Sequence, residues 1–227
     1  MQPLSRVQVS IPADGRKLEG ELIVPGDASG VVAFAHGSGS SRHSPRNQFV
    51  ARELQQAGLA TLLLDLLEED EAEDRQKVFD IELLALRLLA AARWLGDNLS
   101  THSLALGYFG ASTGAAAALL AAARDPGRVS AVVSRGGRPD LAMRWLPQVT
   151  APTLLIVGGD DEPVLQWNRD ALECLTAEKE LVVVPRATHL FEEPGTLEEV
   201  ARQACRWFVR HLPPAGARAD AGEKTRR

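Results

Sequence analysis

The chain alternates between short, continuously apolar segments and longer segments with helical periodicity. Short apolar runs bounded by polar or glycine-rich turns are typical of strands that are buried on both faces. We expect such strands at residues 31–35, 59–64, 104–109, 129–134, 153–157 and 181–184. We expect helices at residues 45–57, 79–94, 115–124 and 196–211. Ser44-Pro45 is a good start for the first helix, and Thr196-x-x-Glu199 reads as a capping box that opens the last.

Before the first buried strand, the chain reads as a β-hairpin. Residues 6–11 and 18–24 are strand-like, and the turn signal Asp14-Gly15 lies between them. Such a hairpin belongs at an antiparallel edge of a larger sheet. Strands then alternate with helices as far as His211, which predicts an α/β fold with a mostly parallel sheet and helices on both faces. We interpret residues 1–212 as one domain.

Two segments are too polar to join the core. Residues 68–74 hold six acids in seven positions, so we expect a solvated loop there. The surrounding segment, residues 66–78, is the only candidate for a lid over a site. Residues 213–227 are rich in proline, alanine, glycine and charged side chains without an apolar anchor, and we expect a disordered tail.

Composition narrows the class of protein. The chain has 227 residues, is 45% hydrophobic and carries a formal charge of −5, which is ordinary for a soluble globular protein. A mildly acidic body argues against nucleic acid or an anionic membrane as a partner. We expect no membrane span, no secretory leader and a cytoplasmic location. Cys174 and Cys205 show neither disulfide nor metal spacing, so we expect buried free thiols, no metal and no cofactor.

The segment around Ser112 carries the first chemical signal. An apolar strand ends there, Gly110-Ala-Ser112-Thr-Gly114 follows, and an Ala/Leu-rich helix comes next. The order strand, G-x-S-x-G, helix is the context that a nucleophile elbow requires. A serine on so tight a turn projects its hydroxyl above the sheet, and its neighbours must be small. The pentapeptide alone is also compatible with an ordinary glycine turn.

Other polar residues follow the ends of neighbouring strands. His36-Gly-Ser-Gly39 follows the first buried strand, Asp160 and Asp161 follow the 153–157 strand, and His189 follows the last. Because sites in parallel sheets form outside the carboxyl ends of the strands, these residues are candidates by position. A serine nucleophile needs a base, here His189, and the base needs an acid, here one of the two aspartates.

An acyl-transfer site also needs donors for the oxyanion. Backbone N–H groups supply them in this type of site, one from the residue after the nucleophile and one from an earlier strand–helix loop. These positions correspond to Thr113 and Ser38. Each motif taken singly is more often a plain turn or a surface residue. Their joint appearance on the correct strand ends, in the chain order Ser, Asp, His, favours a serine hydrolase.

Four motifs together resemble the dienelactone-hydrolase-like branch of the α/β-hydrolase superfamily. They are His36-Gly-Ser-Gly-Ser-Ser, Gly110-Ala-Ser-Thr-Gly114, Gly158-Gly-x-Asp161-x-x-Val164 and Ala187-Thr-His189. The resemblance covers residues 7–211. It implies an eight-stranded sheet with an antiparallel second strand and places Asp161, rather than Asp160, in the acid role. Dienelactone hydrolase proper uses a cysteine nucleophile, whereas this chain has Ser112, so small esters are the expected substrates.

The expected function is therefore hydrolysis of small carboxylic esters through an acyl-enzyme, in a shallow site without an inserted cap domain. The same triad would serve a thioesterase, a peptidase or an acyltransferase. A hydrolase fold kept as a binding module is a third hypothesis, although such a module needs none of these residues. Four arginines lie on the loops at the expected site end and read mostly as surface residues, of which one is a candidate for holding a substrate carboxylate: Arg42, Arg46, Arg135 and Arg138.

Overall fold

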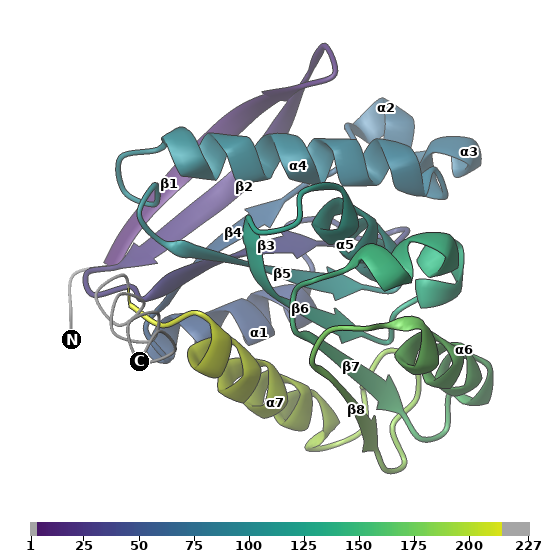
Figure 1. Cartoon of the computed structure of the whole chain (residues 1–227). Helices are drawn as coiled ribbons and strands as arrows, with labels where there is room; N and C mark the ends of the chain where they lie inside the picture. Colours follow the sequence, from purple (N-terminus) through teal and green to yellow (C-terminus); the bar gives the residue numbers. More distant parts are fainter. Residues whose placement is uncertain (1–3, 215–227) are drawn as a thin grey trace, which may run out of the picture.

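An eight-stranded sheet runs through the centre of the protein, with the amino-terminal hairpin at one edge (Figure 1). This computed structural model describes residues 4–214. The strand order is β1-β2-β4-β3-β5-β6-β7-β8, in which β2 is antiparallel to both of its neighbours and β3 to β8 run parallel. The strands span Leu4–Ala13 (β1), Arg16–Pro25 (β2), Gly30–Ala35 (β3), Leu59–Leu64 (β4), Ala105–Ala111 (β5), Val129–Arg135 (β6), Thr153–Gly158 (β7) and Lys179–Val184 (β8).

Helices cover both faces of the sheet (Figure 1). One layer contains α1 and α7, and the other contains α4, α5 and a 3₁₀ segment, η1. The helical segments span Pro45–Gln56 (α1), Glu69–Ala72 (α2), Arg75–Val78 (α3), Ile81–Asp97 (α4), Thr113–Arg124 (α5), Pro139–Gln148 (η1), Glu162–Cys174 (α6) and Thr196–His211 (α7). This is the α/β-hydrolase architecture that the sequence predicts, and residues 4–214 contain no inserted cap domain.

Strand β3 shows why the central strands are apolar throughout. Val31 and Ala33 pack into the core under α4 and α5, whereas Val32 and Phe34 pack into the core under α1 and α7. Side chains of a strand alternate between faces, so a strand covered on both faces needs apolar residues at every position. At the edge hairpin, Asp14 and Gly15 both have positive φ, as a two-residue hairpin turn requires.

Several expectations about local structure need correction. The last helix is not opened by a capping box, because Gly195 occupies the N-cap and the Glu199 carboxylate binds Arg202 and Gln203. Segments η1 and α6 were not anticipated. Cys174 and Cys205 are free but only partly buried. The predicted tail lies, from residue 215 onward, outside the described residues.

The acidic segment is also more than a solvated loop. It folds into α2 and α3, and Glu71 is buried, with a side chain that is 3% exposed. Its two carboxylate oxygens accept hydrogen bonds from Arg87 on α4 at 2.6 and 2.9 Å, and Lys77 donates a further one at 3.1 Å. Arg87 is 1% exposed and also donates to the Leu66 carbonyl. These contacts anchor the segment to the body of the protein.

We expect Glu71→Gln to destabilise the protein by about 3 kcal/mol at neutral pH, because it leaves the buried Arg87 with only the exposed Asp14 carboxylate, 4.0 Å away, as a counter-charge. The hydrogen bonds from Arg87 lower the pKa of Glu71 from 4.5 to about 2. A lowered carboxyl pKa in the folded state contributes stability that is present above the unfolded pKa and is lost as the pH falls toward the folded pKa.

Urea unfolding at pH 7 and pH 3 measures this contribution. More than half of the difference between the wild type and Glu71→Gln should be gone at pH 3, since that pH lies well below 4.5 and approaches 2. Glu69→Gln removes an exposed acid from the same short helix and is the matched control, with an expected change of less than about 0.5 kcal/mol. A pH-independent effect of Glu71→Gln would contradict the ion-pair interpretation.

Candidate active site

Ser112 lies at a strained turn between β5 and α5. Its backbone has φ 51° and ψ −120°, a region that non-glycine residues rarely adopt and that costs on the order of 1–3 kcal/mol. The two glycines of the motif are required by close packing. A methyl group added at Gly110 would lie 2.4 Å from the Ala115 Cα atom, and one added at Gly114 would lie 2.1 Å from the Ala35 carbonyl oxygen. The G-x-S-x-G sequence therefore reflects how tightly the helix turns back over the strand.

Asp161 and His189 form a hydrogen-bonded pair at the same edge of the sheet. The distance between Asp161 Oδ2 and His189 Nδ1 is 2.7 Å. Asp161 is the N-cap residue of α6, and His189 lies in the loop between β8 and α7. The neighbouring Asp160 is exposed and makes no such contact with the described residues. Because His189 Nδ1 is engaged by the carboxylate, its Nε2 is left for a reacting group.

The loop after β6 lies between the serine and the histidine. The Ser112 N–H donates to the Arg135 carbonyl at 3.2 Å, and the Arg138 N–H donates to the Ser112 carbonyl at 3.1 Å. A methyl group added at Gly136 would lie 3.2 Å from the His189 carbonyl oxygen and 3.6 Å from its Cε1. The Ser112 hydroxyl is partly exposed and makes no hydrogen bond within residues 4–214. Catalytic hydrogen bonds are often long before substrate binds.

The two expected oxyanion donors are also neighbours. The Ser38 N–H donates to Thr113 Oγ1 at 3.1 Å, and a methyl group added at Gly37 would lie 2.9 Å from Ser112 Cβ. The loop after β3 thus packs directly on the elbow. In this structure the Ser38 N–H is already engaged by the Thr113 hydroxyl, so an oxyanion would take the place of that hydroxyl as the acceptor.

His36 holds this loop to the end of β4. Its side chain is buried, Nε2 accepts from the Leu66 N–H at 3.0 Å, and Nδ1 lies 3.0 Å from the Gly37 carbonyl oxygen. Since the Leu66 N–H must donate, the proton of the neutral ring is on Nδ1. Burial lowers the pKa of His36, which favours this neutral form. Sequence reasoning noted the His-Gly pair but did not foresee that the imidazole positions the loop.

The four candidate arginines have different surroundings. Arg42 pairs with Asp65, Arg46 with Glu192, and Arg138 with Asp140. Arg135 is not a surface residue: it is 7% exposed, and burial lowers its pKa to about 10, with a further contribution from the charge of Arg46. Its guanidinium makes a single hydrogen bond to the described residues, a long one to Asn47 Oδ1 at 3.4 Å.

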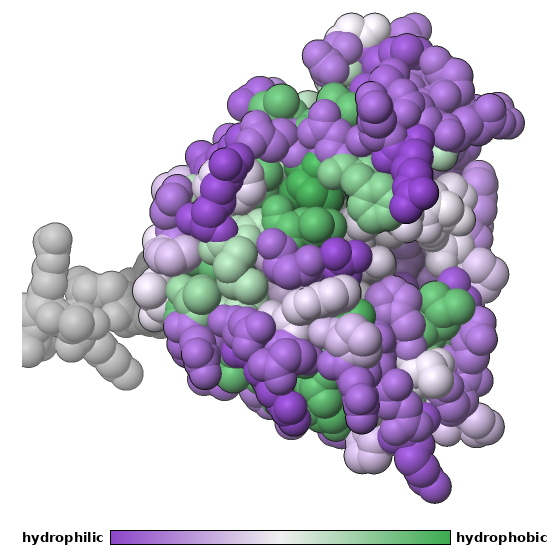
Figure 2. All heavy atoms as spheres, turned by 90° about the vertical axis from the view of Figure 1, so that its right-hand side faces the viewer, coloured by the Kyte–Doolittle hydropathy of each residue, from purple (hydrophilic) through white to green (hydrophobic). Residues whose placement is uncertain are grey.

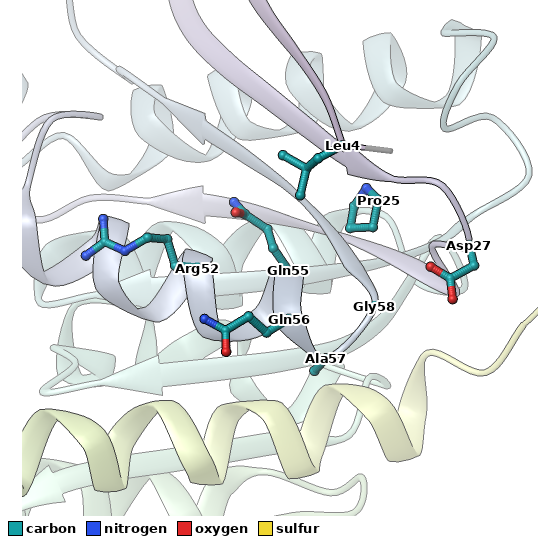
Figure 3. Close-up of a pocket in the computed structure, with 8 residues that line it drawn as sticks. All are labelled: Leu4, Pro25, Asp27, Arg52, Gln55, Gln56, Ala57 and Gly58. Atoms are coloured by element: carbon teal, nitrogen blue, oxygen red, sulfur yellow. The ribbon is translucent and has the colours of Figure 1, made fainter. Parts of the chain in front are cut away.

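Two cavities of similar volume differ in their distance from Ser112. One of about 630 Å³ adjoins the loop after β3 and is lined by His36, Ser40, Asp65 and Glu68, among others. Another of about 700 Å³ lies far from Ser112, between the carboxyl end of α1 and the ends of β1 and β2 (Figure 3). The second cavity lacks a paired acid and base, so we place no chemistry there.

No three His, Cys, Asp or Glu side chains among residues 4–214 cluster as metal ligands. No helix in that range has the length and apolarity to cross a membrane.

Figure 2 shows the face where the parallel strands end, with apolar side chains gathered near its centre and hydrophilic ones around them. A strained serine, an acid–base pair and backbone donors at this edge define an α/β-hydrolase.

Residues 19–212 match the dienelactone hydrolase family, and the chain belongs to that family. A crystal structure of dienelactone hydrolase from Anabaena variabilis is 58% identical, with a TM-score of 0.89 over 92% of this chain and 99% of that one.

More distant structures share the fold. Est1E from Butyrivibrio proteoclasticus is 18% identical with a TM-score of 0.77, over 90% of this chain and 98% of that one. The esterase PF2001 from Pyrococcus furiosus is 19% identical with a TM-score of 0.73, over 92% of each chain. A Mycobacterium tuberculosis protein described provisionally as a phosphoribosyl transferase is 57% identical over 210 residues, or 92% of this chain. This chain spans about half of that relative, 47% of its length.

Proposed function

We propose that this protein is a serine esterase that hydrolyses small carboxylic esters, with Ser112 as nucleophile, His189 as base and Asp161 as the acid that orients the base. The observation that carries the proposal is the 2.7 Å hydrogen bond between Asp161 and His189 at the sheet edge where the strained Ser112 lies. A carboxylate on Nδ1 fixes the histidine tautomer that can accept the serine proton on Nε2.

The reaction would proceed through an acyl-enzyme. Ser112 Oγ attacks the ester carbonyl carbon while His189 Nε2 takes the hydroxyl proton. The tetrahedral oxyanion binds the N–H groups of Ser38 and Thr113. As the C–O bond to the alcohol breaks, His189 returns the proton to the leaving alcohol. A water molecule, deprotonated by the same histidine, then attacks the acyl carbon; as the bond to Ser112 Oγ breaks, His189 returns the proton to Oγ and the carboxylic acid is released.

Two features support small organic esters as the substrate class. Apolar side chains gather at the centre of the face in Figure 2, which suits an organic acyl or alcohol group. The lining of the cavity beside the loop after β3 has an acidic balance, with the carboxylates of Glu19, Asp65, Glu68 and Glu69 against the cations of Lys17 and Arg42, and this balance disfavours anionic groups. Thioesters, amides and acyl acceptors other than water would use the same triad and remain the alternative substrates.

The description of the mycobacterial relative as a phosphoribosyl transferase does not change this proposal. That relative is about twice as long as the region it shares with this chain. The shared region is 210 residues, or 92% of this chain, so it includes most of residues 19–212, which match the dienelactone hydrolase family. We therefore assign the hydrolase chemistry to this chain and propose no transferase activity for it.

A fluorophosphonate probe tests the proposal, because it phosphonylates only a serine that an adjacent base activates. We expect stoichiometric labelling of the wild type, located on Ser112 by peptide mass spectrometry. Hydrolysis of short p-nitrophenyl esters should disappear in parallel with labelling. Labelling at another serine would overturn the assignment of Ser112, and no labelling at all would favour a hydrolase fold used as a binding module.

A further inference from the structure

Asn168 is a fully buried polar residue on α6 that the proposed mechanism does not use. Its side chain is 0% exposed. Its Nδ2 donates to the carbonyl of Val164 on the same helix at 2.8 Å and to the carbonyl of Gly137, in the loop after β6, at 3.0 Å. Its Oδ1 is buried and has no hydrogen-bond partner among the described residues. Burying an unpaired amide oxygen costs about 1–3 kcal/mol, which a leucine of similar size would avoid.

The loop that Asn168 holds is the segment between the nucleophile and the base. Its Arg138 N–H donates to the Ser112 carbonyl, and its Gly136 packs against His189. The loop also packs closely against β6 and α5 at Gly137. A methyl group added at Gly137 would lie 2.0 Å from Ser134 Oγ and 2.7 Å from Ala115 Cβ. Because Arg138 contacts Ser112 and Gly136 contacts His189, a displacement of this loop would change the distance between Ser112 and His189.

Asn168 also connects this loop to the acid. It lies about two turns along α6 from Asp161, the N-cap residue of that helix. Asp161 binds His189 at one end of α6, and Asn168 binds Gly137 farther along it. The helix thus contacts the base through one side chain and the loop beside Ser112 through the other.

We propose that Asn168 is a positioning residue, which fixes the loop of residues 136–138 so that the Ser112 hydroxyl and His189 Nε2 are held at reacting distance. This inference rests on the proposed esterase function. The amide sets geometry through Gly137 and does not touch the substrate. A displacement of about 1 Å in an active site lowers rates by about a hundredfold, so the loss of one such hydrogen bond is measurable in turnover.

The test uses Asn168→Leu, with Asn168→Ala as a second variant in case the first does not fold. Both remove the hydrogen bond to Gly137. We expect kcat to fall about 10- to 100-fold, with KM within about threefold of the wild type, because ester binding does not involve Asn168. Thr101→Val is the matched control: it removes a buried 2.7 Å hydrogen bond to the Leu95 carbonyl just before β5, away from the carboxyl ends of the strands.

A second readout does not depend on activity. Gly136 packs near His189 Cε1, so the Cε1–H resonance of His189 in histidine-labelled protein should shift in the Asn168 variants and stay in place in Thr101→Val. A wild-type protein that neither reacts with the fluorophosphonate probe nor hydrolyses esters would overturn the esterase proposal. The His189 Cε1–H resonance would still show whether Asn168 positions the loop beside His189. Asn168 variants that lose stability as Thr101→Val does, with kcat and the resonance unchanged, would overturn the positioning role.

Discussion

Replacing Ser112 with alanine should reduce kcat/KM for short p-nitrophenyl esters by at least about a thousandfold while the protein stays folded. Triad losses in serine hydrolases reach several orders of magnitude, and the residual rate comes from the oxyanion donors and binding alone. The substitution removes one oxygen that makes no hydrogen bond in the described structure, so the melting temperature should change little. Steady-state kinetics corrected for background hydrolysis, together with thermal unfolding, make the comparison.

Ser38→Ala is the matched control for this prediction. It removes a serine hydroxyl from the same site but keeps the backbone N–H, which is the group proposed to bind the oxyanion. Most of the activity should therefore remain. If Ser112→Ala retains more than about a tenth of the wild-type rate, Ser112 is not the nucleophile.

Replacing Asp161 with asparagine should lower kcat by about ten-thousandfold, the size of effect known for the equivalent change in a serine protease. The Asp161 carboxylate accepts from His189 Nδ1 at 2.7 Å. An amide NH₂ at that position favours the opposite tautomer, in which Nε2 carries the proton and cannot accept one from Ser112. The geometry of the site is otherwise preserved.

Asp160→Asn provides the comparison, because the two aspartates are adjacent in the chain and only one contacts the histidine. The Asp160 side chain is exposed. The backbone N–H of residue 160, which donates to the Ala187 carbonyl, is kept in the variant. We expect activity within about twofold of the wild type, as for surface substitutions in general. Equal losses in the two variants, or a larger loss in Asp160→Asn, would mean that the acid has been misassigned.

Much of the fold was predictable from the sequence because burial on two faces leaves a local signature. The central strands are apolar at every position, as in β3, and Asp14-Gly15 marks the hairpin turn. The elbow was predictable for a similar reason: Gly110 and Gly114 are required by contacts only a few ångströms long. Since parallel strands end at one edge, the sequence also determined that Ser112, His189, the two aspartates and the 36–39 loop lie near one another.

Tertiary structure alone decided how these groups contact one another. Position after the strand leaves Asp160 and Asp161 equivalent and the family resemblance favours Asp161, but only the backbone at the start of α6 brings the Asp161 carboxylate into contact with His189. The burial of Glu71 depends on Arg87, an oppositely charged residue from another helix. The link from Asn168 to Gly137 joins segments 31 residues apart. Local patterns report burial and turn geometry, whereas a buried polar contact depends on the exact placement of two distant segments, so only the folded structure reveals it.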